Sequence, residues 1–497
     1  MLKEITTEEI NEVMEDAWQA FHFYRKMSLK ERADFMRSIA IEIDNLGDSL
    51  LTTAMQETNL PEARLRGEKG RTIFQLNSYA DACEKGQWLD ARIDTALPNK
   101  IPPKPDIRKM LVPLGPVVVF GASNFPFAYS TAGGDTACAF AAGCPVIVKG
   151  HPAHAKTSEL MASAILKAVA NCNMPNGIFA HVPGATNSTG ETLVKHPYTK
   201  AVGFTGSFAG GKQLYDWGNQ RKEPIPVFAE MGSVNPVFLL PEKMNLSAAE
   251  IAKQCAASIT LGVGQFCTNP GIIIGIDNDD LEKFISILSY EIKSIIPAPM
   301  LNKSIYKNYI DKKKSALSQA DVEEVAIAEL NAGLNEGIAT IASTNAKSFI
   351  SNPQLHQEVF GPYSIIIRCA DQNEMLTVAR HLEGQLTATF MATENDIIKN
   401  TELVEAVKNI CGRLIINSVP TGVEVCLSMH HGGPYPATTD SRFTSVGADG
   451  IKRFARPVAF QNWPDTLLPD ELKNENPLNI RRTVDNEIEK GKVRGEK

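Results

Sequence analysis

The chain is 497 residues long with 43% hydrophobic and 22% charged residues, an ordinary globular composition with room for two or three domains. Its formal net charge of −7 gives no electrostatic reason to expect nucleic acid or an anionic membrane as a partner. The nine cysteines show no CxxC pairs, so we expect reduced thiols in a cytoplasmic protein. No apolar run reaches the roughly 18 residues that a membrane-spanning helix needs.

The N-terminal region, residues 1–95, is predicted to be helical, because apolar side chains recur every three or four residues. Thr6 and Glu9 have the spacing of a capping box, which indicates a helix start rather than a signal peptide. The stretch 94–115 has four prolines between positions 98 and 105. Proline cannot donate to a β-ladder, so we predict an edge hairpin or a projecting arm here.

From residue 116 onward, short apolar runs alternate with helical patterns. Such alternation with nearly continuous apolar strands predicts parallel sheets covered by helices on both faces. The strands expected in the first region are 115–122, 145–150, 177–184 and 200–207, and a small-residue helix is expected over 127–143. In the second region a helix over 245–262 is predicted to begin with a Ser247–Glu250 capping box.

Cys267 stands in the stretch GVGQFCTNPG, on an irregular connection between a helix end and the apolar strand that follows. Buried structural cysteines usually lie inside periodic apolar segments, so this position favours chemistry, although loops also hold inert thiols. A thiol with an ordinary pKa is mostly protonated at pH 7 and needs help to react. The surrounding loop contains no histidine, so it gives no local support for a Cys–His pair.

Three further polar residues follow expected strands. Glu230 ends an apolar strand; apolar neighbours would raise its pKa and suit it as a general base, but it could also be a solvent-facing residue. Asn124 could donate to an oxyanion or simply cap the next helix. Lys149 lies at a strand's carboxyl end, where ligands bind in open α/β sheets. The glycine-rich turn 203–211 could hold phosphate, although it lacks the GxGxxG pattern.

The order of these motifs resembles that of the aldehyde dehydrogenase superfamily. The motifs are NFP, VIVK, FTGS, a strand-end glutamate, GQFC and EVFGP, and the resemblance runs from the helical N-terminus to about residue 470. It implies an α/β fold with a Rossmann-like cofactor domain, a catalytic α/β domain and a small β oligomerisation arm. The ranges implied are 1–95 with 113–232 for the cofactor domain, 233–454 for the catalytic domain, and 96–112 with 455–475 for the arm.

The resemblance also implies a mechanism and a set of site residues. Cys267 would attack the aldehyde, hydride transfer to the cofactor would leave a thioester, and Glu230 would activate the hydrolytic water. Asn124 would complete an oxyanion hole with the Cys267 N–H. The residues implied in cofactor binding are Lys149 and Glu358 at the two riboses, Gly206 and Ser207 under the pyrophosphate, and Phe360 beside the nicotinamide ring. Family members are homodimers or homotetramers, so we expect an oligomer.

Several positions differ from the usual family pattern. The family's usual motif Glu-Leu-Gly-Gly-Lys is here Glu-Met-Gly-Ser-Val, with the changes at Met231, Ser233 and Val234. Pro152 stands where a glutamate often contacts the adenosine ribose. Losing that carboxylate removes repulsion against a 2′-phosphate, so we expect NADP as the cofactor, with NAD as the alternative. His151 and His154 flank Pro152.

These variants are similar to those of the α-ketoglutaric semialdehyde (2,5-dioxovalerate) dehydrogenase branch. That branch implies the product 2-oxoglutarate and a substrate carboxylate, for which Arg442 is a candidate partner. The alternatives are an NADP-dependent medium- or long-chain fatty aldehyde dehydrogenase, an enzyme that passes the acyl group to coenzyme A, and a non-catalytic protein with the same fold. Glu230 and Cys267 argue against the last two.

The adjacent histidines His430 and His431 have no acidic or cysteine residue at metal-ligand spacing. We therefore expect them to serve in a loop and expect no metal. The predicted partners are a small aldehyde and further copies of the chain, with no nucleic acid and no membrane.

Overall fold

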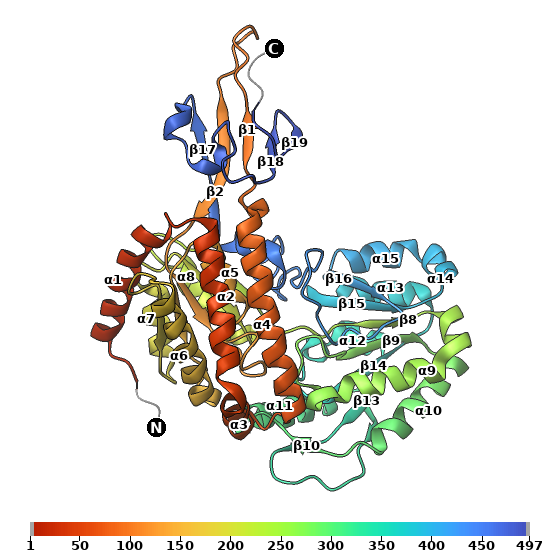
Figure 1. Cartoon of the computed structure of the whole chain (residues 1–497). Coiled ribbons are helices and arrows are strands. Elements are labelled where there is room, and N and C mark those ends of the chain that lie inside the picture. Colours follow the sequence, from red (N-terminus) through yellow and green to blue (C-terminus); the bar gives the residue numbers. More distant parts are fainter. Residues whose placement is uncertain (1–3, 494–497) are drawn as a thin grey trace.

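Three β-sheets of five or more strands organise the computed structural model, which describes residues 4–493 (Figure 1). Two of them carry helices on both faces, and the third projects away from the other two at the top of the view. Among the described residues, no helix is both long enough and apolar enough to cross a membrane.

The first sheet is parallel throughout, with the strand order β5-β4-β3-β6-β7. Its strands are β3 (Val117–Phe120), β4 (Val146–Lys149), β5 (Phe179–Val182), β6 (Ala201–Thr205) and β7 (Val227–Glu230). Val118 and its neighbours pack on α1, while Val117 and Val119 belong to the larger core on the opposite face. The prediction of a parallel sheet buried on both faces is confirmed.

The helices of this half supply the two covering layers. They are α1 (Thr7–Tyr24), α2 (Leu29–Asn45), α3 (Gly47–Thr58), α4 (Glu62–Lys85), α5 (Gly134–Ala142), α6 (Ala155–Asn171), α7 (Asn187–Lys195) and α8 (Phe208–Asn219). The Thr6–Glu9 capping box predicted for the first helix is present. The helix expected over 127–143 begins only at Gly134, because the carboxylate of Glu68 on α4 accepts the N–H groups of Phe127 and Ala128 and holds that stretch in turns.

The second sheet has seven strands in the order β11-β13-β14-β9-β8-β15-β16, parallel except for β11. Its strands are β8 (Val237–Leu239), β9 (Ile272–Ile276), β11 (Glu323–Ile327), β13 (Thr340–Asn345), β14 (Tyr363–Cys369), β15 (Gln385–Met391) and β16 (Cys411–Ile416). The helices are α9 (Pro241–Thr260), α10 (Asp279–Lys293), α11 (Lys303–Leu317), α12 (Ala346–Ser351), α13 (Gln372–His381), α14 (Glu394–Lys399) and α15 (Thr401–Lys408). A small pair, β10 (Ala298–Pro299) and β12 (Glu336–Gly337), lies apart from the sheet.

Helix α9 begins earlier than the sequence pattern indicates. The predicted start at Ser247 is instead an interruption inside the helix, with φ −143° and ψ 20°. Pro241 begins the helix, which is a favoured position for proline because its missing N–H is not needed there.

The projecting sheet has the order β17-β2-β1-β18-β19. Its strands are β1 (Arg92–Asp94), β2 (Ile107–Pro113), β17 (Ala455–Gln461), β18 (Arg482–Val484) and β19 (Glu487–Glu489). The longest ladder joins β2 and β17 in antiparallel register. Two strands lie beyond residue 475, outside the range predicted for the arm, and the assignment of domains and of an oligomerisation role stays a prediction.

A buried ion pair ties the C-terminal part of the chain to the first sheet region. Arg453 is 4% exposed and its guanidinium lies 2.7 Å from the carboxylate of Asp135 at the start of α5. Removing one partner of such a pair leaves an uncompensated buried charge, which is strongly destabilising.

We therefore expect Asp135→Asn to lower the free energy of unfolding by about 3 kcal/mol in a urea titration. The matched control is Asp216→Asn, which breaks the surface pair with Lys212 on α8 and should cost less than about 1 kcal/mol. Equal losses of unfolding free energy in the two variants would contradict the larger stabilisation expected of the buried pair.

Candidate active site

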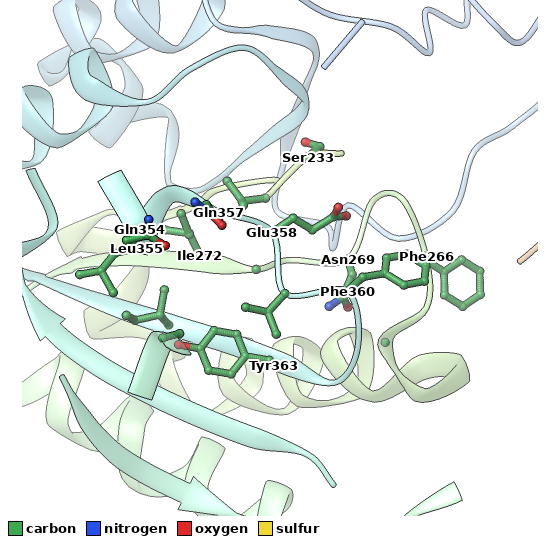
Figure 2. Close-up of a pocket in the computed structure, with 16 residues that line it drawn as sticks. Ser233, Phe266, Asn269, Ile272, Gln354, Leu355, Gln357, Glu358, Phe360 and Tyr363 are labelled. Atoms are coloured by element: carbon green, nitrogen blue, oxygen red, sulfur yellow. The ribbon is translucent and has the colours of Figure 1, made fainter. Parts of the chain in front are cut away.

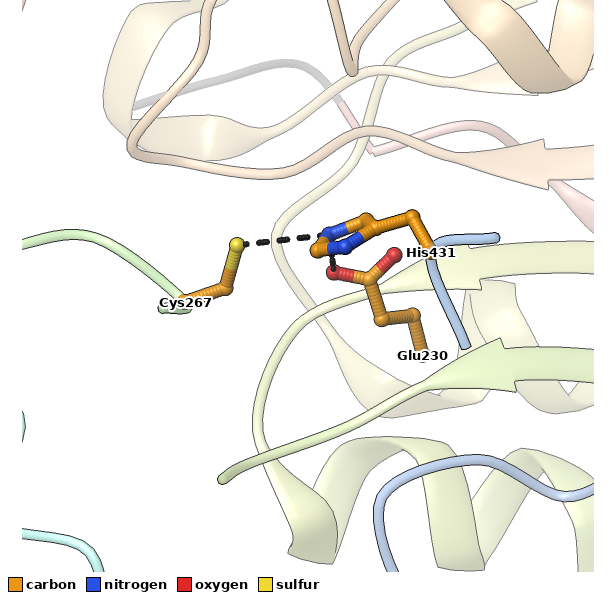
Figure 3. A group of neighbouring side chains, drawn as sticks. All are labelled: Glu230, Cys267 and His431. Atoms are coloured by element: carbon orange, nitrogen blue, oxygen red, sulfur yellow. Dashed lines mark hydrogen bonds and ion pairs between the residues drawn. The ribbon is translucent and has the colours of Figure 1, made fainter. Parts of the chain in front are cut away.

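Three side chains that are far apart in sequence meet between the two covered sheets. Cys267 lies on the turn between α9 and β9, Glu230 ends β7, and His431 lies on the long connection after β16 (Figure 3). The Nε2 atom of His431 lies 3.5 Å from the Cys267 sulfur and 3.0 Å from Oε1 of Glu230. Glu230 and His431 are only 3% and 1% exposed, so this contact is shielded from solvent.

The structure corrects two expectations about these residues. The loop around Cys267 contains no histidine, but His431 reaches the thiol from 164 positions away in sequence. His431 therefore does more than occupy a loop, and Glu230 is not a solvent-facing strand end. The only available signal was the His430–His431 pair before two glycines, and that pattern carries no information about distance to Cys267.

The loop that carries His431 is pinned on both sides of the histidine. Its backbone N–H donates to Thr444 Oγ1 at 2.8 Å, and its carbonyl accepts the N–H of Ser445 at 2.8 Å. The hydroxyl of Ser445 also donates to Glu230. The imidazole is thereby held against both the carboxylate and the thiol.

The pKa values of the thiol and the carboxylate move in opposite directions. Burial raises the pKa of Cys267 well above its usual range, and the charges of Glu230 and Glu358 raise it further. Burial alone would also raise the pKa of Glu230, but the charge of His431 and the hydrogen bonds from His431 and Ser445 outweigh it, so that pKa is lowered. The predicted raised pKa of Glu230 is therefore wrong, and at neutral pH the site holds a protonated thiol beside a carboxylate.

Asn124 faces the loop that carries Cys267 and does not cap a helix. Its side-chain amide donates to the carbonyl of Gln265 at 3.2 Å, two residues before the cysteine. The stretch that carries Asn124 is anchored by α4, where Arg64 donates to the Asn124 carbonyl at 2.9 Å and Glu68 accepts the N–H groups that follow. An amide donor is thus fixed against the loop that carries the thiol.

The turn after Glu230 gives a structural role to Ser233, one of the departures from the usual family pattern. Ser233 donates to the Gln385 side chain at 2.9 Å and accepts the N–H of Leu386, so this buried hydroxyl joins the turn to β15. Asn235, in a left-handed conformation with φ 46°, donates to the carbonyls of Cys267 and Asn269 at 2.9 Å each. No sequence motif singled out Asn235, which holds the loop that carries Cys267 through these two hydrogen bonds.

Three of the residues predicted to contact the cofactor, Lys149, Gly206 and Ser207, lie at the carboxyl ends of strands in the first sheet. Lys149 ends β4, burial lowers its pKa, and within residues 4–493 its ammonium group has no hydrogen bond or ion pair. Ser207 caps α8 by accepting the Gly210 N–H, and the first turn of α8 contains no acidic residue. A partly buried cation and an open helix N-terminus fit a ligand with phosphate groups. Gly206 is required because a Cβ atom there would lie 2.6 Å from the Phe204 ring.

The two histidines near Lys149 form hydrogen bonds with backbone groups. His154 is buried, with Nε2 2.9 Å from the Ala122 carbonyl oxygen and Nδ1 3.3 Å from the Ser158 hydroxyl. Nδ1 of His151 accepts the N–H of Ala153, and burial lowers the pKa of His151 to about 3. Lys149 is thus the cationic side chain at this strand end, since His151 is neutral at pH 7.

Glu358 and Phe360 line a pocket together with Ser233, Phe266 and Asn269 (Figure 2). Burial raises the pKa of Glu358 to about 7, although the charge of Lys312 and the N–H of Ser233 oppose the shift. Phe266 immediately precedes Cys267, so the pocket adjoins the thiol. A carboxyl group that titrates near neutrality is a common feature of functional sites.

Comparisons with known proteins agree with this site. The model of the "Aldehyde dehydrogenase family" matches residues 1–434. The alpha-ketoglutaric semialdehyde dehydrogenase of Acinetobacter baylyi is 44% identical over 486 residues, covering 97% of this chain and 92% of that protein. Alpha-ketoglutaric semialdehyde dehydrogenase 2 of Azospirillum brasilense is 46% identical over 482 residues, with the same two coverages.

Solved structures show the same fold. A Thermus 1-pyrroline-5-carboxylate dehydrogenase with bound NAD has a TM-score of 0.77 at 19% identity, over 92% of this chain and 86% of that one. An NADP-dependent glyceraldehyde-3-phosphate dehydrogenase from Bacillus halodurans, complexed with NADP, has a TM-score of 0.76 at 19% identity, over 92% of both chains. The expected α/β architecture is confirmed, and the chain belongs to the aldehyde dehydrogenase family and is an aldehyde-oxidising enzyme.

Proposed function

We propose that this enzyme oxidises α-ketoglutaric semialdehyde to 2-oxoglutarate with NADP, through a thiohemiacetal and a thioester on Cys267. The observation that carries the proposal is the contact of His431 with both Cys267, at 3.5 Å, and Glu230, at 3.0 Å. The two relatives above, named for this semialdehyde and covered over 92% of their length, support the choice of substrate.

The first step requires the thiol to lose its proton. Because the pKa of Cys267 is raised, the proton must leave for a neighbouring base as the sulfur bonds to the aldehyde carbon. With the proton of the neutral imidazole on Nδ1, Nε2 of His431 accepts the thiol proton, and the Nε2–H of the resulting imidazolium then donates to the Glu230 carboxylate, 3.0 Å away. The electron pair of the carbonyl bond moves to oxygen.

The oxyanion and the hydride then have defined destinations. The Asn124 amide and the Cys267 N–H donate to the oxyanion, in a setting where such donors contribute strongly to rate. A bound nicotinamide cofactor would supply the hydride acceptor, and the substrate's acyl group would stay on Cys267. Lys149, the α8 N-terminus at Ser207, and Glu358 would hold the cofactor, with Phe360 beside the ring.

Hydrolysis uses the same residues. Glu230, with its lowered pKa, is ionised and takes a proton from water as the water oxygen bonds to the acyl carbon. The carbon–sulfur bond breaks, the sulfur leaves with the electron pair, and the imidazolium of His431 returns a proton to it. Release of the other proton from Glu230 to solvent restores the carboxylate. A base held beside the thiol for hydrolysis disfavours transfer of the acyl group to coenzyme A.

Several features support NADP over NAD. Pro152 places no carboxylate after β4, His151 is neutral, and Lys149 remains as an unpaired cation among the described residues. A 2′-phosphate would gain from that charge and meet no opposing carboxylate at Pro152. Cytoplasmic location and assembly into a homodimer or homotetramer through the projecting sheet belong to the same proposal.

The proposed substrate and cofactor are tested by measuring kcat/KM for α-ketoglutaric semialdehyde and for decanal, each with NADP and with NAD. We expect the highest value for α-ketoglutaric semialdehyde with NADP. A preference for decanal would instead support the fatty aldehyde alternative, and a preference for NAD would refute the argument from Lys149 and Pro152.

The role of His431 is tested by His431→Gln. We expect kcat/KM to fall about 100-fold, as for loss of a general acid–base group, and the pH–rate profile to lose one ionisation. The control is His430→Gln, at the half-buried neighbouring position, with kcat/KM within about twofold of the native enzyme. A native pH profile in His431→Gln would exclude proton transfer by His431.

Glu358 predicts a pH dependence of cofactor binding. A ribose hydroxyl donates better to a carboxylate than to a carboxyl group, so the dissociation constant of NADPH should fall as the pH rises through about 7 and level off above it. In Glu358→Gln this dependence should vanish, whereas Glu383→Gln at an exposed position should keep it. Fluorescence titration between pH 6 and 8 measures the effect, and a flat native curve would contradict it.

A further inference from the structure

Two arginines with no carboxylate partner among the described residues lie near the Cys267 site. Arg71 is on α4 and Arg413 is on β16. The Nε atom of each is buried and lacks a hydrogen-bond partner. Both residues are partly buried, and a partly buried cation without a counter-ion is costly, so such groups often pair with an anion.

Both guanidinium groups contact the same short loop. Arg71 donates to the carbonyl of Val423, and Arg413 donates to the carbonyls of Pro420 and Gly422 at 3.0 Å each. The two cations therefore meet at the adjoining residues Gly422 and Val423. Their hydrogen-bond partners there are neutral carbonyls, and neither guanidinium forms an ion pair among the described residues, although the Glu68 carboxyl group lies within electrostatic reach of Arg71.

A line of aromatic rings connects these arginines to the cysteine. Arg71 donates to the Tyr129 hydroxyl at 3.2 Å, and the Tyr129 ring lies 5.1 Å from the ring of Phe125. Phe125 in turn lies 5.7 Å from Phe266, the residue before Cys267. Arg413 also lies within electrostatic reach of both Cys267 and Tyr129.

Other arginines near the site are already committed. The Arg64 guanidinium lies 4.5 Å from the ring centres of both Phe125 and Phe266 and donates to the Asn124 carbonyl, so it supports the loop beside the thiol. Arg442, the candidate from the sequence, has a side chain that is 79% exposed and forms an ion pair with Asp440. Neither offers a free fork to a ligand.

We propose that Arg71 and Arg413, together with the Tyr129 hydroxyl, bind the carboxylate of the substrate and select short aldehydes that carry a carboxylate at the far end. This inference rests on the proposed function and replaces Arg442 as the carboxylate partner. The planar guanidinium offers paired donors that match a carboxylate. The apolar chain of a fatty aldehyde would instead cover two unpaired cations, which is unfavourable.

The test compares 5-oxopentanoate with pentanal, two five-carbon aldehydes that differ in the terminal carboxylate. In Arg71→Met and in Arg413→Met, we expect kcat/KM for 5-oxopentanoate to fall about 10- to 100-fold, mostly through KM, because a charged hydrogen bond is lost. The value for pentanal should change less than about threefold. Arg71→Lys keeps the charge without the planar fork and should lie between Arg71→Met and the native enzyme.

The control variant is Arg66→Met, on the same helix, where the side chain is 56% exposed and pairs with Glu62 and Asp48. In this variant kcat/KM for 5-oxopentanoate and for pentanal should equal the native values. Glutarate should inhibit pentanal oxidation by the native enzyme and by Arg66→Met, and much less by Arg71→Met. If Arg413→Met does not fold, Arg71→Met, Arg71→Lys and the glutarate measurement still decide the question.

Equal losses for the two aldehydes, or unchanged values for 5-oxopentanoate in Arg71→Met, would overturn the assignment of the arginines. If the native enzyme prefers α-ketoglutaric semialdehyde while the variants keep that preference, the inference fails and the proposed function stands. If the native enzyme oxidises pentanal as well as 5-oxopentanoate and prefers decanal, the proposed function itself fails.

Discussion

The buried contact between Glu230 and His431 is the interaction on which the site depends. It joins the end of β7 to a loop whose nearest strand, β16, belongs to the other covered sheet. The loop is fixed across β7 by further contacts: Met231 N–H donates to the Ala437 carbonyl at 2.8 Å, and Glu230 forms an isolated β-bridge with Thr438. The Glu230 carboxylate can be buried here because His431 contacts it and the Ser445 hydroxyl donates to it.

Around that contact, the two halves of the molecule have separate tasks. The first sheet presents Lys149 and the start of α8 at its carboxyl edge, where parallel sheets commonly bind ligands. The second sheet presents the cysteine loop, which Asn235 holds by two hydrogen bonds. Gly264 allows the close approach of this loop to the Glu358 segment, since a Cβ atom there would lie 2.3 Å from Gly361. In the proposed mechanism, substrate and cofactor meet along this boundary.

Burial affects the acidic groups of the site differently. It raises the pKa of Cys267 and of Glu358, whereas His431 and Ser445 reverse its effect at Glu230. The result is a protonated thiol beside a carboxylate, with an imidazole between them. This division of protonation states suits a thiol that reacts only when a base takes its proton, and it protects the resting thiol from adventitious chemistry.

The amino-acid sequence by itself determined the local features of this protein. The alternation of apolar strands and helices, the Thr6–Glu9 cap and the cysteine on an irregular turn all depend on residues close together in the chain. Those patterns indicated the family and the parallel sheets correctly. They placed the starts of α5 and α9 wrongly, because Glu68, from a distant helix, holds the turns before α5, and because α9 continues through the irregular residue Ser247.

Only the tertiary structure decided which side chains meet. His431 reaches Cys267 across 164 positions, and Arg71 and Arg413 reach the same loop from a helix and a strand that are far apart in sequence. The direction of the Glu230 pKa also depended on such neighbours, since its sequence context contains apolar residues but not His431 or Ser445. Spacing along the chain describes local hydrogen bonds and periodic burial, whereas electrostatic and proton-transfer contacts depend on distance in space.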